Sequence, residues 1–317
     1  MKKRFLLSFL IAFIIFGAGY FWLFNKIEGG MSRAEKIERE SGIGEIKEAE
    51  SNPISDELNE VFFLLVGVDT DSVDRKKSHE KKDIGIRSDT MMLVRVNFDD
   101  GSVRIMSLPR DSRVPVNGSL DKLNHAHSYG GMPLLMETVR DFTNLDVRNY
   151  VRVDFDAVEK IVDAIGGVEI DIPEKMYKEG SDPGREFVID FEPGRQRLNG
   201  KQAVLFLRYR EYEDGDLGRV RNQQYFMKEM IKQALAPKNI FKIPELLDIY
   251  SNYVDTNLGT NMVYAGARMA TRLDLDNIET TTYPGEEKRL ELSYYILDKE
   301  EGPKLIKEYF GDYLLDK

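Results

Sequence analysis

The stretch Val61-Phe-Phe-Leu-Leu-Val-Gly-Val68 contains no polar side chain, and Asp69 follows it directly. A strand that is apolar at odd and even positions alike buries both of its faces, as the middle strands of a helix-covered sheet do. This stretch therefore predicts an α/β fold in which a central mixed β-sheet is covered by helices on both faces.

Strands and helices alternate along the rest of the chain. Further strands are expected at 90–98, 103–108, 150–154 and 168–172, and shorter ones near 279–283 and 292–297. Helices are expected at 133–144, 155–165, 199–207, 217–235, 244–254, 261–272 and 300–315. We find no internal repeat, so residues 59–317 are expected to form one domain.

The N-terminus has the features of a membrane anchor. Lys2, Lys3 and Arg4 precede an uncharged segment, residues 5–24, with Trp22 near its far end. Twenty residues of helix span about 30 Å, the hydrocarbon thickness of a bilayer. The basic cluster predicts a cytoplasmic tail (1–4), one transmembrane helix and a domain outside the cell.

A cleaved signal peptide is the competing interpretation. Signal peptides have apolar cores of about 7–15 residues followed by a small-residue cleavage site. Here the apolar segment is longer and no Ala-x-Ala follows it, which favours an uncleaved anchor. Residues 25–58 are polar and rich in charge, and we interpret them as a linker.

Composition excludes several classes of function. Of the 317 residues, 45 are Lys or Arg and 55 are Asp or Glu, which gives a net charge of −10 and disfavours nucleic acid as a partner. There are no cysteines, which excludes disulfides, thiolate metal sites and a cysteine nucleophile. An exported protein without disulfides fits the surface of a Gram-positive bacterium.

Two carboxylates lie at strand boundaries. Asp69 closes the first apolar strand, and Asp89 precedes the second. Ligands of open α/β sheets bind at strand ends, and Mg²⁺ in proteins is often held by one or two carboxylates together with phosphate oxygens. The pair predicts a site for Mg²⁺ or Mn²⁺, whereas each aspartate alone is better explained by turn formation.

Arginines lie near the same strand ends. Arg87 precedes Asp89, and Pro109-Arg110-Asp111 ends the third strand. The proline stops the strand and fixes the turn, which would aim Arg110 at one place. Asp111 either orients Arg110 or caps the turn.

A second group of candidate phosphate-binding side chains begins about 100 residues after Arg110. Arg208 and Arg210 are expected on one side of an extended segment, and Arg219 and Gln223 on one face of a helix. The guanidinium fork matches phosphate oxygens, so these residues are candidates for binding a diphosphate. The alternative is an ordinary solvated basic surface. A further pair, His125 and His127, is an unconvincing metal site because no third ligand is evident.

These residues together resemble the LytR-CpsA-Psr family of wall-polymer transferases over about Phe62 to Lys228. The resemblance implies that a glycopolymer, such as a teichoic acid or a capsule-like polysaccharide, passes from a polyprenyl diphosphate carrier to peptidoglycan. It implies that Asp69 and Asp89 hold Mg²⁺ and that Asp89, Arg110 and Asp111 are catalytic. The diphosphate would bind Arg87, Arg110, Arg208, Arg210, Arg219 and Gln223.

One position departs from the family pattern. Asp71 stands where Arg is usual in the family.

Two other functions remain open. A polyprenyl diphosphate phosphatase would use the same site with water as acceptor. A non-catalytic surface protein would only bind the polymer.

The anchor predicts the topology of the whole protein. A reporter fused after Lys317 is expected outside the cell, and protease added to intact protoplasts is expected to digest the chain beyond about residue 30. A domain protected from protease in intact protoplasts would contradict this orientation.

Overall fold

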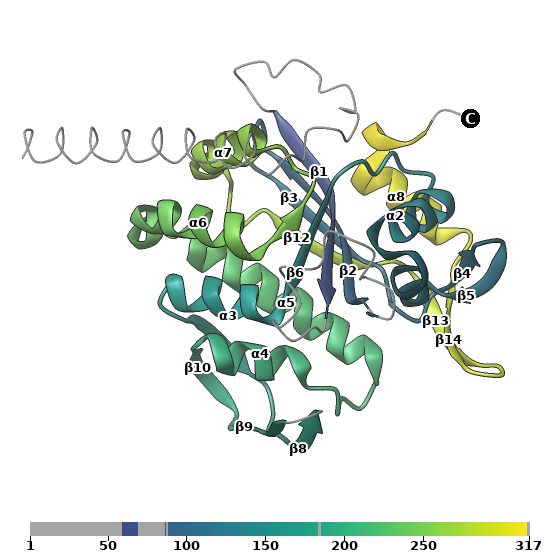
Figure 1. The fold of residues 1–317 in the computed structure, drawn as a ribbon, viewed down its shortest axis with the longest axis horizontal. Helices are drawn as coiled ribbons and strands as arrows, with labels where there is room; N and C mark the ends of the chain where they lie inside the picture. Colours follow the sequence, from purple (N-terminus) through teal and green to yellow (C-terminus); the bar gives the residue numbers. More distant parts are fainter. Residues whose placement is uncertain (1–58, 69–85, 87, 183–184, 316–317) are drawn as a thin grey trace, which may run out of the picture. The chain divides into compact units, whose positions relative to one another are not determined.

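A six-stranded mixed sheet forms the centre of the protein in the computed structural model (Figure 1). From one edge to the other, the strands are β11 (Asp255–Thr256), β6 (Tyr150–Asp154), β1 (Glu60–Val68), β2 (Ser88–Asn97), β3 (Val103–Ser107) and β12 (Ile278–Thr282). β1 runs parallel to β6 and antiparallel to β2, so the sheet is mixed, as the sequence predicts.

The structure describes residues 59–68, 86, 88–182 and 185–315, all within one unit of the chain, Glu57–Lys317. The predicted tail, anchor and linker lie outside these residues, as do Asp69, Asp71 and Arg87. Within the described ranges, no helix is long and apolar enough to cross a membrane.

Helices cover both faces of the sheet, which explains why β1 is apolar throughout. Leu64 and Val66 point to one face, where α2 (Leu123–Thr143) and α8 (Glu301–Phe310) pack. Leu65 points to the other, which is covered by α5 (Asp216–Ala234) and by the chain around α6 (Ile243–Tyr253) and α7 (Thr260–Met269). Figure 1 shows these two groups of helices on opposite sides of the sheet.

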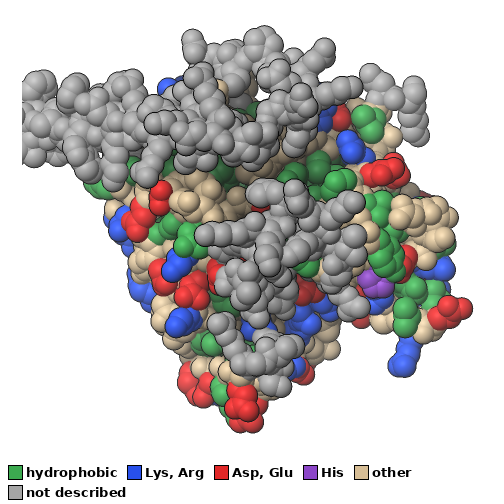
Figure 2. All heavy atoms as spheres, viewed as in Figure 1, with side chains coloured by type: hydrophobic (Ala, Val, Ile, Leu, Met, Phe, Trp, Pro, Cys, Tyr) green, Lys and Arg blue, Asp and Glu red, His purple; other side chains and the backbone are tan. Residues whose placement is uncertain are grey.

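A second layer packs beside α5. It contains α3 (Phe155–Ala164), α4 (Gly200–Arg208) and two pairs of strands, β7 (Val168–Ile172) with β10 (Gly194–Leu198) and β8 (Met176–Asp182) with β9 (Arg185–Phe191). These elements share an apolar core centred on Phe206 and Phe226. Acidic side chains gather over the lower end of the face in Figure 2, where β8 and β9 lie in Figure 1.

The strand predicted at 168–172 forms with those bounds but lies outside the central sheet, paired only with β10. Its burial alternates, with Val168, Ile170 and Ile172 buried and the two residues between them accessible. A strand of this kind has one wet face, so it suits a small sheet at the surface of the core rather than the middle of a covered sheet.

Helix α2 begins ten residues earlier than predicted, at Leu123 instead of 133. Gly130 and Gly131 have non-helical backbone angles, and Pro133 lies just beyond them. They separate an N-terminal stretch of α2, which was not predicted, from the stretch beyond them, which matches the helix predicted at 133–144. The added N-terminal part of α2 lies beside the candidate site described below.

Two short hairpins contain three strands that were not predicted, β4 (Arg113–Val116), β5 (Ser119–Lys122) and β13 (Gly285–Arg289), whereas their fourth strand, β14 (Ser293–Leu297), was expected near 292–297. β4 pairs with β5, and β13 pairs with β14. They are only four or five residues long, and half of β4 and all of β13 are exposed. Short exposed strands have too little apolar periodicity to be recognised from sequence.

Gln224 fixes α5 on the sheet. Its side chain is buried, and its Nε2 donates to Ser107 Oγ at 2.9 Å, to Thr281 O at 2.5 Å and to Thr282 Oγ1 at 3.1 Å. The helix is therefore held against β3 and β12 by a buried polar contact.

Replacing this side chain should destabilise the domain. Gln224→Ala leaves buried acceptors without their donor, so we expect the free energy of unfolding to fall by about 2–3 kcal/mol. Urea unfolding of the domain measures the change. Gln196→Ala, at a partly exposed position on β10, is the control and should change stability by less than about 0.5 kcal/mol. Equal losses in the two variants would contradict the anchoring role.

Candidate functional site

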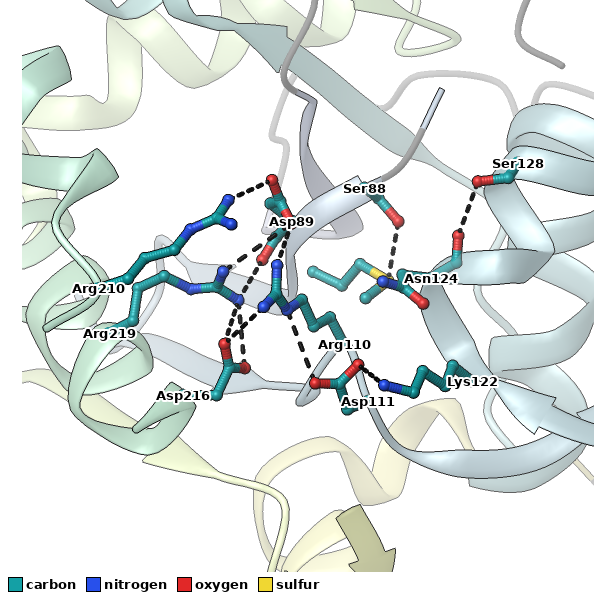
Figure 3. A network of polar contacts seen from close by, with 11 residues as sticks. Ser88, Asp89, Arg110, Asp111, Lys122, Asn124, Ser128, Arg210, Asp216 and Arg219 are labelled. Atoms are coloured by element: carbon teal, nitrogen blue, oxygen red, sulfur yellow. Dashed lines mark hydrogen bonds and ion pairs between the residues drawn. The ribbon is translucent and has the colours of Figure 1, made fainter. Parts of the chain in front are cut away.

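A β-bulge presents Asp89 at the edge of the sheet. Gly67 pairs with Thr90 and Val68 pairs with Ser88, so Asp89 has no partner on β1. An extra residue of this kind bends the strand and redirects its side chain. Asp89 is thereby turned toward the gap between the β3–β4 connection and the start of α5 (Figure 3).

Arg110 lies in the turn that follows β3. The Ser112 amide donates to Pro109 O at 3.0 Å, which closes the turn. The neighbouring backbone is held from two sides, because the Asn124 amide donates to Arg110 O at 3.0 Å and the Tyr295 amide donates to Asp111 O at 2.8 Å. The predicted turn is therefore present, and it is anchored by α2 and β14.

Arg210 and Arg219 approach from the opposite side. Arg210 follows α4, and Arg219 belongs to the first turns of α5. Gly215 precedes α5 and has a φ of +62°, a backbone conformation that residues other than glycine rarely adopt. A Cβ on Gly218 would lie 2.4 Å from Asp214 Oδ1 and from Tyr212 Cβ, so the start of α5 packs closely on the preceding loop.

Three guanidinium groups converge on the Asp89 carboxylate (Figure 3). Arg110 Nη1 donates to Oδ1 at 2.5 Å, and Arg210 Nη2 donates to Oδ2 at 3.0 Å. Arg219 Nη2 donates to the Asp89 carbonyl oxygen at 3.2 Å, while its Nη1 lies 3.8 Å from Oδ1. Residues 21 to 130 positions apart in sequence thus meet at one point.

Asp216 is a member of this cluster that the sequence analysis did not select. Its Oδ1 lies 3.2 Å from Arg110 Nη2 and 2.8 Å from Arg219 Nη2. The available signal was its position three residues before Arg219 at a helix start, where the two side chains share a face. Three guanidiniums face the two carboxylates of Asp89 and Asp216, so these five side chains together carry a net positive charge.

Burial and charge compete in setting the pKa values of the cluster. Burial alone would raise the pKa of Asp89, but the charges of Arg210, Arg110 and Arg219 bring it below the ordinary value. Burial lowers the pKa of Arg219 to about 10, against the opposing effect of Asp216. Both groups are therefore ionised at neutral pH.

The cluster retains donors that its own carboxylates do not use. Within the described part of the chain, Nε and Nη1 of Arg219 and Nε of Arg110 are buried and lack a hydrogen-bond partner. A buried donor without an acceptor is costly, and charged donors are more so. The site is thus equipped to bind a further anion with several acceptor oxygens, such as a diphosphate.

Asp111 lies at the side of the cluster nearest α2. Its Oδ1 is 2.9 Å from Lys122 Nζ, and its Oδ2 is 3.8 Å from Arg110 Nε. About a quarter of its side chain is exposed. Asp111 therefore lies beside Arg110. Unlike Asp89, it is not surrounded by the three guanidinium groups.

The sequence prediction for Arg208 and Arg210 is wrong in its geometry. Arg208 is the last residue of helix α4, and Tyr209, which follows it, has an extended backbone. The Arg208 guanidinium lies over the rings of Phe155 and Phe187, at 5.5 and 4.4 Å from their centroids. The pair therefore does not share one side of an extended segment. In contrast, Arg219 and Gln223 both lie on helix α5, as predicted, and both are buried.

The predicted metal ligands are only partly within view. Asp89 is described, whereas Asp69 lies outside the described residues, as does Arg87. Among the residues that the structure describes, no group of three or more Asp, Glu or His is placed to hold a metal. His125 and His127 do not form a pair, since His127 is fully buried with Nδ1 2.9 Å from Ile86 O, and His125 contacts Asp121.

Known proteins are similar to this chain in sequence and in fold. The model of the LytR_cpsA_psr family matches residues 25–309. The polyisoprenyl-teichoic acid–peptidoglycan teichoic acid transferase TagU of Oceanobacillus iheyensis is 30% identical, over 95% of this chain and 91% of that protein. The enzyme of the same type named TagV, from Bacillus subtilis, is 28% identical, over 83% of this chain and 67% of that protein.

The fold is likewise similar to a solved structure. The crystal structure of B. subtilis TagV superposes with a TM-score of 0.67 at 26% identity, and the match covers 81% of this chain and 99% of that one. The mixed sheet with helices on both faces is therefore an architecture that this relative shares.

Anion binding by the arginine cluster can be measured directly. Arg110→Lys keeps the charge but loses the planar fork, so we expect inorganic pyrophosphate to bind about 10-fold more weakly in calorimetry. Arg195→Lys, an exposed substitution on β10, should leave the affinity unchanged. Equal affinity in wild type and Arg110→Lys would return the cluster to the role of a structural ion-pair network.

Proposed function

This chain belongs to the LytR-CpsA-Psr family, and on that premise we propose that it transfers a glycopolymer from a polyprenyl diphosphate carrier to peptidoglycan. The proposal rests on the convergence of Arg110, Arg210 and Arg219, whose spare donors match the oxygens of a diphosphate. The names of the relatives specify a polyisoprenyl-linked teichoic acid as donor and peptidoglycan as acceptor.

In the proposed reaction, a hydroxyl oxygen of the acceptor attacks the phosphorus that carries the glycopolymer. A new P–O bond forms, the bond to the polyprenyl phosphate breaks, and polyprenyl monophosphate leaves with the bonding electrons. The guanidiniums bind the diphosphate and stabilise the charge that develops on its oxygens. Arg87, Arg208 and Gln223 remain proposed contacts of the same substrate.

The acceptor proton needs a base, and we assign this role to Asp111. Asp89 is held by three guanidiniums, which stabilise its ionised form and make it a poor proton acceptor. Asp111 has one close cation, Lys122, and a partly exposed carboxylate beside Arg110. A carboxylate in this position can take the proton as the hydroxyl attacks.

Asp89 fits the donor set of Mg²⁺ or Mn²⁺, with Asp69 as its proposed second ligand. Mg²⁺ accepts one or two carboxylates when phosphate oxygens and waters complete its shell, so the absence of a three-carboxylate cluster among the described residues is compatible with it. A bound divalent cation would neutralise charge on the diphosphate.

The polyprenyl chain is assigned to the sheet face beneath α5. The apolar cluster there is bordered by side chains that are only partly buried, namely Phe63, Val96, Val153, Met227, Ile231, Val254, Leu258 and Leu273. Apolar surface left accessible in this way suits a lipid tail. The proposed anchor (5–24) would keep the domain at the outer surface of the cytoplasmic membrane, where such a carrier is found.

Product analysis distinguishes the proposed functions. With a polyprenyl diphosphate-linked glycan, Mg²⁺ and peptidoglycan, we expect phosphodiester-linked polymer together with polyprenyl monophosphate. Equal release of monophosphate with and without peptidoglycan, and no linked polymer, would identify a phosphatase. Binding without turnover would identify a polymer-binding protein.

The role of Asp89 is tested by Asp89→Asn. The amide keeps the size of the side chain but removes the charge that would bind the cation, so we expect turnover to fall at least roughly 100-fold. Mn²⁺ binding in the presence of pyrophosphate, measured by electron paramagnetic resonance, should weaken in the same variant. Asp190→Asn, at an exposed position on β9, is the control and should behave as wild type. Wild-type Mn²⁺ binding by Asp89→Asn would exclude Asp89 as a ligand.

A further inference from the structure

The start of α2 carries a hydrogen-bonded group of three side chains outside the arginine cluster. Asp121 Oδ1 lies 2.8 Å from His125 Nδ1, and Tyr129 Oη donates to Asp121 Oδ2 at 2.9 Å. The His125 and Tyr129 rings are 5.6 Å apart. The backbone amide of Lys122 also donates to Asp121 Oδ1, so this carboxylate is fixed by three partners.

This group adjoins the candidate site. Asp121 precedes Lys122, whose Nζ contacts Asp111. His125 and Tyr129 belong to the same first turns of α2 as Asn124 and Ser128, which Figure 3 shows beside the arginine cluster. The group is thus joined to the reacting region through the backbone of β5 and the first turns of α2.

The chemistry of the group is that of a carbohydrate contact. Tyr129 is 54% exposed, so part of its ring lies at the surface, where the apolar face of a pyranose can pack against it. Asp121 and His125 are partly exposed, with side-chain exposures of 23% and 21%. Their polar atoms are preorganised at the edge of the ring, where the hydroxyls of a stacked sugar would lie.

The geometry of phosphoryl transfer indicates whether this sugar belongs to the donor or to the acceptor. The attacking and leaving oxygens lie roughly in line on opposite sides of the phosphorus. With the polyprenyl chain assigned to the sheet face beneath α5, as in the proposed function, its phosphate would leave toward that face and the acceptor would approach from the opposite side. That side is formed by β5 and the first turns of α2, where Asp121, His125 and Tyr129 lie.

We infer that Tyr129, His125 and Asp121 form the subsite that binds a sugar ring of the acceptor glycan and positions its hydroxyl near Asp111. This inference rests on the proposed function for the identity of the acceptor. The subsite itself is defined by the stacking ring and the two fixed polar groups.

The test measures steady-state transfer with Tyr129→Ala, using isolated peptidoglycan glycan strands as acceptor. Loss of the stacking ring should raise the KM for the strands roughly 3- to 10-fold, while the KM for the lipid-linked donor stays at the wild-type value. Tyr129→Phe keeps the ring and should recover most of this loss. Tyr177→Ala is the matched control, because Tyr177 is 52% exposed and also donates to a carboxylate, that of Glu179.

An unchanged acceptor KM in Tyr129→Ala would overturn the inference. A raised donor KM would also overturn it, since the subsite would then bind the sugar of the donor. Calorimetry measures binding of the same strands without the lipid-linked donor. This measurement tests the acceptor subsite independently of the proposed transferase function. Wild-type protein that binds strands through Tyr129 but transfers nothing would refute the proposed function and support the subsite. Equal binding by wild type and Tyr129→Ala would refute the subsite whether or not transfer occurs.

Discussion

The whole site depends on one carboxylate that holds three guanidiniums together. Arg110, Arg210 and Arg219 come from separate segments, and like charges this close repel one another, more strongly where the surroundings are partly buried. The bulge at Asp89 places the compensating charge between them, and Asp216 adds a second. Arg219 is almost fully buried, so its charge is tolerated only because these partners are present.

This arrangement gives Asp89 a structural effect besides any role in binding a cation. Removing its side chain would leave three arginines without their shared partner, and the cost of an uncompensated buried charge is high. An alanine at this position therefore disturbs the cluster itself, whereas asparagine still accepts hydrogen bonds from the guanidiniums. Losses of activity at Asp89 are interpretable only when the two substitutions are compared.

The sequence predicts the sheet, its covered faces and much of the cluster, because strand ends meet at one edge of a sheet regardless of their separation in the chain. It fails where local signals are ambiguous. Arg208 and Arg210 are two apart in a stretch that suits either a strand or a helix end, and the helix extends to Arg208. Asp216 was missed because a carboxylate at a helix start is usually explained by the helix dipole alone. The kink at Gly130 and Gly131 concealed the first turns of α2.

Charge balance explains why a divalent cation suits a site that already has three arginines. The guanidiniums exceed the carboxylates of Asp89 and Asp216 by one charge. A diphosphate joined to lipid and sugar carries a negative charge on each phosphoryl group, so the occupied cluster would be negative overall. As the bond to the lipid phosphate breaks, the leaving group gains further negative charge. A divalent cation held by Asp89, as proposed, would supply further positive charge to offset this change.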